Sequence, residues 1–154
     1  MIFSVLVFLQ GFFSGGDNYH EPPTKLEIEL QSVGVKDGTV VTLHCQVVNR
    51  GAGWTAVDAK AVMGNELLRV RFHDEKGHTV HFKGDNMLGY VPLDPGHPVA
   101  LSEGCFLGFE QKYVLDHHPA HLKATAVFTY ENFSKKPVSH LWEGTITSAP
   151  LKLW

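Results

Sequence analysis

The sequence predicts an all-β fold made of antiparallel sheets. Runs in which apolar and polar side chains alternate recur along the chain, and this period of two is typical of half-buried strands. Turn signals such as Asp-Gly and Pro-Gly separate most of these runs. The chain has 154 residues, of which 44% are hydrophobic and 19% are charged. That composition is enough for one domain with its own core, and it excludes a chain that is disordered throughout.

The first predicted hairpin spans residues 25–48. Apolar and polar side chains alternate over residues 25–31, and a second alternating run covers residues 39–48. The dipeptide Asp37-Gly38 stands between the two runs and is typical of tight hairpin turns. One face of the second run carries only apolar side chains, which are Val41, Leu43, Cys45 and Val47. Cys45 is therefore expected to point into the core.

A second hairpin is predicted over residues 68–83, where an alternating run precedes a polar turn at residues 74–77. A Pro-Gly turn at residues 93–96, a long alternating run at residues 122–130 and a last run at residues 142–154 follow. Pro150 is expected to bend the last run or to place it at an edge, and Trp142 is expected in the core opposite the strand of Phe128. Two short segments, residues 56–63 and 110–116, could each hold a helical turn.

Seven or eight short strands with turns between them predict an immunoglobulin-like antiparallel β-sandwich over residues 25–154. Residues 1–16 carry no charged side chain and end in small residues, which fits a secretory signal peptide cleaved after Gly16. This apolar run is too short to span a membrane, and a buried first strand is the alternative reading. Residues 17–24 are then a linker, and the mature protein is expected to be secreted or periplasmic, with no membrane insertion.

Two cysteines, Cys45 and Cys105, allow one disulfide bond in an exported chain. Cys105 lies inside or beside another strand-like run. The alternative is a pair of free buried thiols, which pack as small hydrophobic side chains. The sequence favours the bond slightly but does not define its geometry.

Several motifs follow one another in a characteristic order. They are Asn49-Arg50-Gly51 at the end of an early strand, a polar hairpin tip between Phe72 and Val80, the segment 90–96, a run ending in Tyr113-Val114-Leu115, and the alternating strand from Ala124 to Tyr130. This order, over about residues 26–130, resembles secreted immunoglobulin-like modules, including the non-catalytic N-terminal domain of deuterolysin-type and peptidyl-Lys metalloendopeptidases. The resemblance implies a binding or folding-assistant module. The sequence lacks the His-Glu-x-x-His motif of the catalytic part of those proteases, and Trp142-Glu143-Gly144 is not part of the protease domain.

The sequence offers no recognisable catalytic motif. It contains neither a Gly-x-Ser-x-Gly nucleophile motif nor a phosphate-binding glycine loop, and its carboxylates are scattered. Thirteen basic and 16 acidic residues give a formal net charge of −3, which excludes a nucleic-acid footprint. We therefore expect a protein that is not an enzyme and needs no cofactor. A small hydrolase with an unrecognised site is the alternative.

Ten histidines are the most unusual feature of the composition. The densest group consists of His117, His118 and His121, and three imidazoles this close in sequence could bind zinc or copper. A solvated turn is the alternative, because neighbouring loop side chains usually do not converge on one point and Pro119 restricts the loop.

Trp54 lies among glycines in a predicted loop, where an aromatic side chain can anchor a partner. We predict that Trp54 is at least partly exposed and belongs to a binding surface; the alternative is an indole folded back over the end of the sandwich. The expected function is that of a secreted, non-catalytic module that binds a protein or glycan partner through its loops. The alternatives are a protease-associated inhibitor or folding helper and a histidine-rich extracellular metal binder.

Overall fold

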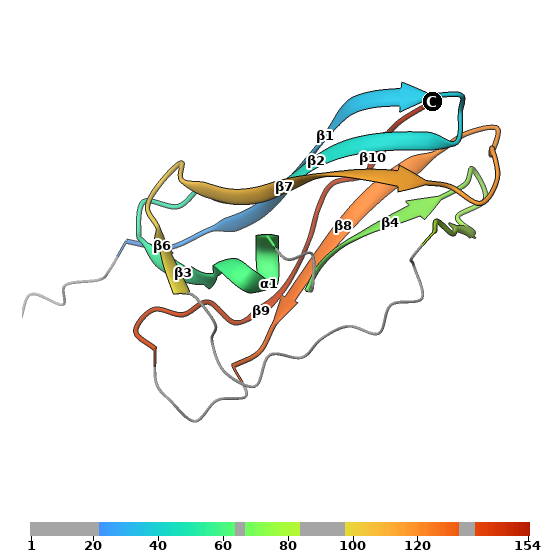
Figure 1. Cartoon of the computed structure of the whole chain (residues 1–154). Coiled ribbons are helices and arrows are strands. Elements are labelled where there is room, and N and C mark those ends of the chain that lie inside the picture. The colour runs from blue at the N-terminus through green and yellow to red at the C-terminus, as the bar shows by residue number, and fades with distance from the viewer. Residues whose placement is uncertain (1–21, 64–66, 84–97, 133–137) are drawn as a thin grey trace, which may run out of the picture.

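A computed structural model of the chain describes residues 22–63, 67–83, 98–132 and 138–154 (Figure 1). The described part contains ten strands and one short helix. In chain order these are β1 (Leu26–Lys36), β2 (Val40–Asn49), β3 (Thr55–Asp58), α1 (Ala59–Met63), β4 (Leu68–His73), β5 (Thr79–Val80), β6 (Pro98–Leu101), β7 (Phe106–Val114), β8 (Lys123–Tyr130), β9 (Gly144–Thr147) and β10 (Leu151–Lys152). The predicted signal peptide, most of the predicted linker and the predicted turn at residues 93–96 lie outside the described residues.

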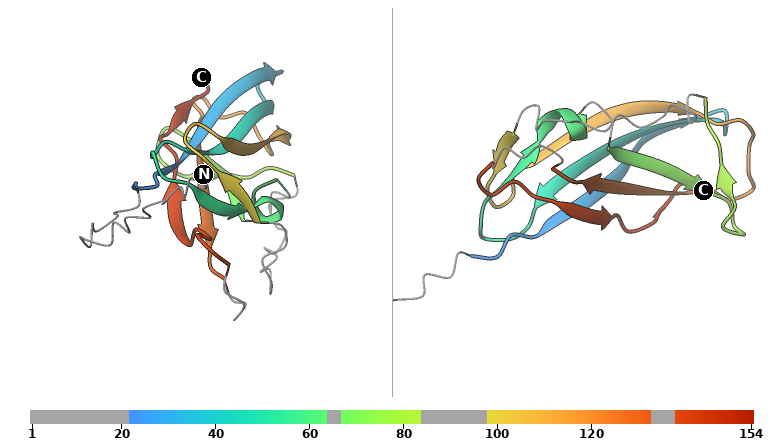
Figure 2. Two further views of the ribbon diagram at one scale, coloured as in Figure 1. Left: turned by 90° about the vertical axis from the view of Figure 1, so that its left-hand side faces the viewer. Right: turned by 90° about the horizontal axis from the view of Figure 1, so that it is seen from below.

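The strands form two larger antiparallel sheets that enclose a common core (Figure 1, Figure 2). One sheet has the order β1-β2-β7, and the other has the order β10-β8-β4-β5 with β9 also paired to β8. β3 and β6 pair separately. The prediction of an all-β fold is confirmed. The described strands number ten rather than seven or eight, because the sequence pattern does not predict β3 and β6 and because the last run is divided into β9 and β10.

The β1–β2 hairpin turns at Asp37-Gly38, as predicted. Both residues have positive φ angles, 52° and 62°, a conformation that Gly adopts freely and Asp tolerates. The pairing extends to Leu26 opposite Asn49, with a register shift between Ser32 and Gly34 that gives β1 a bulge. Asn49 is thus placed at the end of β2, beside the point where β1 begins.

The inward-facing side chains of both sheets form the core. Its largest fully buried members include Tyr113, Phe72, Phe128, Leu43, Leu68 and Leu122. Phe72, Phe82 and Tyr113 pack edge to face, with ring centroids 5.0, 5.2 and 5.8 Å apart. Burying a large apolar side chain stabilises a fold by roughly 1.5–3 kcal/mol. In the described part of the chain, Tyr113 Oη is a buried oxygen without a hydrogen-bond partner, so packing holds this ring in place.

The two predicted helical turns have different outcomes. Residues 55–58 form β3, and α1 covers only the rest of the first predicted segment. Asp58 caps α1, because its Oδ1 accepts the backbone N–H groups of Lys60 and Ala61 at 2.9 and 3.3 Å. The second prediction is wrong: most of residues 110–116 belong to β7, where pairing with β2 outweighs any local helical preference. No helix in the described ranges has the length and apolar character to cross a bilayer.

The last run of the chain is an edge strand with an interruption, as Pro150 predicts. Ser148 N donates to the carbonyl oxygen of Ala126 at 2.8 Å, and Ser148 Oγ accepts the N–H of Ala126 at 2.9 Å. A side-chain hydroxyl therefore replaces a backbone acceptor between β9 and β10. Backbone pairing with β8 resumes after Ser148 in β10. Beyond β10, Leu153 N donates to Leu122 O, just before β8, at 2.9 Å.

Candidate functional site

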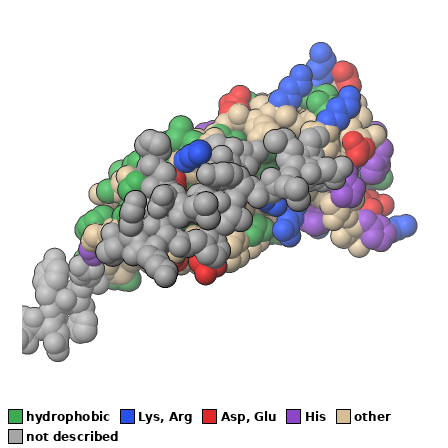
Figure 3. Space-filling view, turned by 60° about the horizontal axis from the view of Figure 1, so that its bottom comes forward, with side chains coloured by type: hydrophobic (Ala, Val, Ile, Leu, Met, Phe, Trp, Pro, Cys, Tyr) green, Lys and Arg blue, Asp and Glu red, His purple; other side chains and the backbone are tan. Residues whose placement is uncertain are grey.

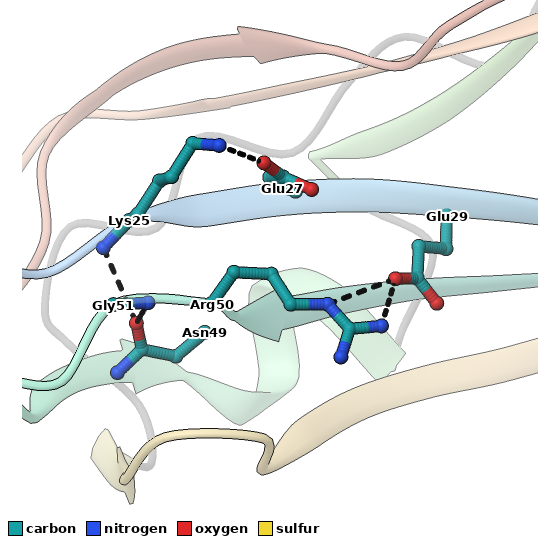
Figure 4. A network of polar contacts seen from close by, with 6 residues as sticks. All are labelled: Lys25, Glu27, Glu29, Asn49, Arg50 and Gly51. Carbon is teal, nitrogen blue, oxygen red and sulfur yellow. Dashed lines mark hydrogen bonds and ion pairs between the residues drawn. The ribbon is translucent and has the colours of Figure 1, made fainter.

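Asn49, the last residue of β2, organises the end of the molecule where the tryptophan loop (residues 50–54) begins. Its side chain is fully buried, and its Nδ2 donates to the carbonyl oxygens of Gly53 and Leu101 at 2.6 and 3.0 Å. Its Oδ1 accepts the backbone N–H groups of Lys25 and Gly51 at 3.2 and 2.9 Å (Figure 4). One side-chain amide thereby ties the segment before β1, the tryptophan loop and the end of β6 together.

Two glycines let the tryptophan loop pass directly against the segment before β1. A Cβ atom at Gly51 would lie 2.3 Å from the carbonyl oxygen of Pro23, and one at Gly53 would lie 2.0 Å from that of Pro22. Gly53 N also donates to Pro23 O at 3.2 Å. Any other residue at either position would push the two segments apart, so their contact requires glycine.

Charged side chains on the outer surface brace the same end of the molecule (Figure 4). Arg50 pairs with Glu29 through Nη2 and through Nε, the latter at 3.1 Å, and Gln46 Nε2 donates to the other carboxylate oxygen at 2.8 Å. Hydrogen bonds from Arg50 and then from Gln46 hold the pKa of Glu29 below its usual value. Arg50 is exposed and Glu29 and Gln46 are half-buried, so this solvent-accessible ion pair orients the surface more than it stabilises the fold.

The indole of Trp54 is exposed, as predicted, and lies against the imidazole of His140. Trp54 is 44% exposed, and the two ring centroids are 4.2 Å apart with the ring planes tilted by 40°. His140 has a φ of 57°, which is uncommon for a residue other than glycine. Its carbonyl oxygen accepts Ala56 N at 2.8 Å and Thr55 Oγ1 at 2.9 Å. β3 therefore holds His140 in this conformation beside Trp54.

A pocket of about 470 Å³ lies beside the two rings. Residues from three segments of the chain line it: Pro22, Thr24, Gly53, Trp54, Thr55, His140, Leu141, Trp142 and Glu143. Trp142 is anchored to the core, because its ring stacks on Phe128 with centroids 5.3 Å apart and its backbone N–H donates to Ala56 O at 2.8 Å. Glu143 is exposed, and its Oε1 accepts the N–H of Asn132 at 2.5 Å. The volume lies in the range of small-molecule sites.

No family model and no curated protein matches the chain. The pocket beside Trp54 is therefore considered from the chemistry of its lining alone. Its lining combines the rings of Trp54, His140 and Trp142 with threonine hydroxyls and the carboxylate of Glu143. Such a combination suits a ligand that has both an apolar face and hydrogen-bonding groups.

The structure does not bring the three predicted metal ligands together. His118 Nδ1 donates to the carbonyl oxygen of Gly38 at 2.7 Å, and its ring centroid lies 5.6 Å from that of Trp154. His117 and His121 are exposed. In the part of the chain that the structure describes, no group of three His, Cys, Asp or Glu side chains could hold a metal ion. The contact with the β1–β2 turn fixes His118, and this is why the three imidazoles do not form the predicted metal site.

The predicted disulfide bond between Cys45 and Cys105 is not formed in the structure. Cys45 is fully buried on the inner face of β2, as predicted, whereas Cys105 is exposed, and both thiols are free. The carbonyl oxygen of Cys105 accepts the N–H of Asn49 at 3.1 Å, which places Cys105 beside the end of β2. Cys45 is four residues back along that strand, or roughly 13 Å. A disulfide bond needs Cα atoms within about 7 Å. Burial raises the pKa of the Cys45 thiol to about 12.

Sequence patterns do not predict His140, Glu143 or Asn49 as parts of this site. Asn49 has a weak local signal, because an Asn-x-Gly sequence often ends a strand at a turn. His140 and Glu143 have none, since they reach the tryptophan loop only through the isolated pairing of Ala56 with Leu141. The expected packing of Trp142 against the strand of Phe128 is present, with Trp142 half-buried.

Proposed function

We propose that this protein is a secreted, non-catalytic immunoglobulin-like module that binds a glycan through the pocket beside Trp54. The observation that carries the proposal is the exposed indole held against His140 at the rim of that pocket. Secretion is inferred from the uncharged apolar run at residues 1–16, which is typical of a signal peptide.

The strand order supports an immunoglobulin-like arrangement. β1, β2 and β7 take the places of strands A, B and E, while β4, β5, β8 and the β9–β10 edge take those of C, C′, F and G. β6 comes where strand D would, but it pairs with β3. Cys45 lies on the inner face of the second strand, where antibody domains carry one cysteine of their intersheet bond. β8, the counterpart of strand F, contains no cysteine, so such a bond has no partner here.

The pocket favours a glycan over a flat protein surface. A sugar ring has one face of C–H groups, which packs on an indole, and an edge of hydroxyl groups, which needs hydrogen-bonding partners. Trp54 offers the exposed aromatic face, and Thr24 and Glu143 are exposed polar residues of the lining. Asn132 N occupies Oε1 of Glu143, so Oε2 is the oxygen that can accept a sugar hydroxyl. A volume of about 470 Å³ accommodates a short stretch of a glycan chain.

A glycan array tests this proposal, with Trp54→Ala and Phe106→Ala compared with the wild-type protein. Phe106 is a matched control, because it is 55% exposed but does not line the pocket. We expect the wild type and Phe106→Ala to bind the same glycans and Trp54→Ala to lose them. Capture of a protein from the native secretome by the wild type but not by Trp54→Ala would show that Trp54 belongs to a binding surface. It would also show that the ligand of this surface is a protein and not a glycan. The inhibitor or folding-helper role implied by the protease resemblance stays a prediction, and capture of a secreted metalloprotease would support it.

A further inference from the structure

The end of the molecule away from the Trp54 pocket gathers three loops into one surface, which we call the histidine end. It consists of the β1–β2 turn with the last residue of β1 (residues 36–39), the β4–β5 hairpin with its flanks (residues 73–83) and the β7–β8 connection with the first residue of β8 (residues 115–123). Leu115 N donates to Thr39 O at 2.7 Å, and Asp116 N donates to His81 O at 3.0 Å. β2 runs from this end to Asn49, so the two ends are roughly 30 Å apart.

Six of the ten histidines of the chain lie on the histidine end. They are His73, His78, His81, His117, His118 and His121. His73 is half-buried, and the other five are exposed. Figure 3 shows histidine side chains gathered at this end of the molecule, interspersed with charged side chains. They come from segments far apart in sequence, so the fold creates the concentration of imidazoles.

The fixed charges around these imidazoles balance at neutral pH. The lysines of this surface are Lys36, Lys76, Lys83 and Lys123, and its carboxylates are Asp37, Asp74, Glu75 and Asp116. Four positive charges therefore meet four negative charges. Arg71 and Lys112 are exposed farther along β4 and β7, and the exposed Lys152 lies opposite Lys123 on β10. All three add positive charge at the margin. The net charge of the histidine end is thus governed by its imidazoles.

Acidification converts this balanced surface into a cationic one. Imidazole is the side-chain group whose charge changes between about pH 5 and pH 8, and the histidine end gathers six of them. One of them already faces a carboxylate, because His78 Nδ1 lies 3.2 Å from Asp74 Oδ2. Another contacts the β1–β2 turn, because His118 Nδ1 donates to Gly38 O at 2.7 Å. His117 and His121 are exposed members of this surface on the β7–β8 connection.

We infer that the histidine end docks on anionic phospholipid bilayers at acidic pH. Two exposed apolar side chains favour a bilayer over a sulfated polysaccharide as the polyanion. Val33 is 54% exposed and Val35 is 46% exposed on the final part of β1, next to Lys36 and the turn. A bilayer accepts apolar side chains at its interface together with the cations around them, whereas a sulfated chain uses only the charge. Each basic residue near an anionic bilayer raises partition by about fivefold.

Vesicle sedimentation of the full chain tests this inference, with phosphatidylcholine vesicles that contain about 30% phosphatidylserine or none. We expect the partition coefficient on phosphatidylserine vesicles to rise at least tenfold from pH 7.5 to pH 5.5, and to stay low on phosphatidylcholine alone. His117→Gln/His121→Gln should lower the pH 5.5 value at least fivefold without changing the melting temperature. His44→Gln is the control, because His44 lies mid-strand on β2, outside the histidine end.

Val33→Ser/Val35→Ser separates a bilayer from a soluble polyanion. We expect this double variant to weaken vesicle binding at pH 5.5 and to leave retention on heparin unchanged. Acid-dependent binding to heparin without binding to vesicles would overturn the inference and assign the surface to a sulfated chain. Equal partition at both pH values, or an undiminished response in His117→Gln/His121→Gln, would overturn it as well. The Trp54→Ala variant should behave as the wild type in this assay, which keeps the result independent of the proposed glycan pocket.

Discussion

The ring centroids of Trp54 and His140 lie 4.2 Å apart, and this contact joins the loop after β2 to the segment before β9. Neither residue is free to move independently of the sheets. The backbone of His140 is bonded to Ala56 and Thr55, and the tryptophan loop is tied to Asn49 through Gly53. The aromatic surface is therefore formed before a ligand arrives, which lowers the ordering cost of binding.

Replacing His140 with glycine should separate ligand binding from folding. Glycine adopts a φ of 57° without strain, so we expect the melting temperature to change by only a few degrees. The ring contact with Trp54 is lost, and ligand affinity should fall severalfold because the indole is no longer held. His140→Val should instead destabilise the fold by roughly 1–3 kcal/mol, since a β-branched residue does not tolerate this conformation. Unchanged affinity in His140→Gly would show that Trp54 does not need its neighbour.

Asn49→Asp should be among the most destabilising single substitutions in the chain. An aspartate keeps the shape of the side chain but replaces the Nδ2 donor with an acceptor, so the carbonyl oxygens of Gly53 and Leu101 lose their partner. We expect the free energy of unfolding in urea to fall by about 3 kcal/mol or more, because the new carboxylate is also fully buried. Arg50→Gln, one residue away at the surface, should change it little. Similar effects of the two substitutions would contradict the role given to Asn49.

The two thiols should differ sharply in reactivity. Cys105 is exposed, whereas Cys45 is buried and burial raises its pKa to about 12. Ellman's reagent at pH 8 should therefore modify one thiol of the native protein rapidly and the second only on unfolding. Cys105→Ser should abolish the fast phase, and Cys45→Ser should leave it intact. A native protein with no reactive thiol, together with a disulfide-linked peptide pair, would restore the predicted bond.

Alkaline pH should destabilise the fold through Cys45 and Tyr130. Burial, followed by the charge and hydrogen bond of Asp58, raises the pKa of Tyr130 to about 12. A raised pKa in the folded state means that the unfolded chain loses its protons first. Stability is therefore fully present below the ordinary pKa values of 9.0 for cysteine and 10.0 for tyrosine, and it is lost as pH rises toward 12. Urea unfolding at pH 8, 10 and 11 should show this decline, and Tyr130→Phe should reduce it. A constant free energy of unfolding over that range would contradict the raised pKa values of Cys45 and Tyr130.

Local pattern predicts the strands better than it predicts the site. Alternation identifies the inner face of β2, and the Asp37-Gly38 dipeptide identifies the hairpin, because both depend on neighbours in sequence. β3 is too short to show a pattern, and its pairing with β6 joins segments about 40 residues apart, as Val57 opposite Val99 illustrates. The same limit hides the pocket, since His140 meets Trp54 only after the sheets have formed. Cys105 fails as a disulfide partner for the related reason that register, and not spacing, decides which side chains meet.

Calorimetric titration of the best array glycan into wild type, Trp54→Ala and Phe106→Ala tests the central claim most directly. The account predicts that Trp54→Ala loses at least about 1 kcal/mol of binding free energy, or about fivefold in affinity, while its melting temperature stays close to that of the wild type. Phe106→Ala should retain wild-type affinity. The opposite result, in which Trp54→Ala binds normally but unfolds at a clearly lower temperature, would make Trp54 a packing residue and contradict a binding site at this pocket.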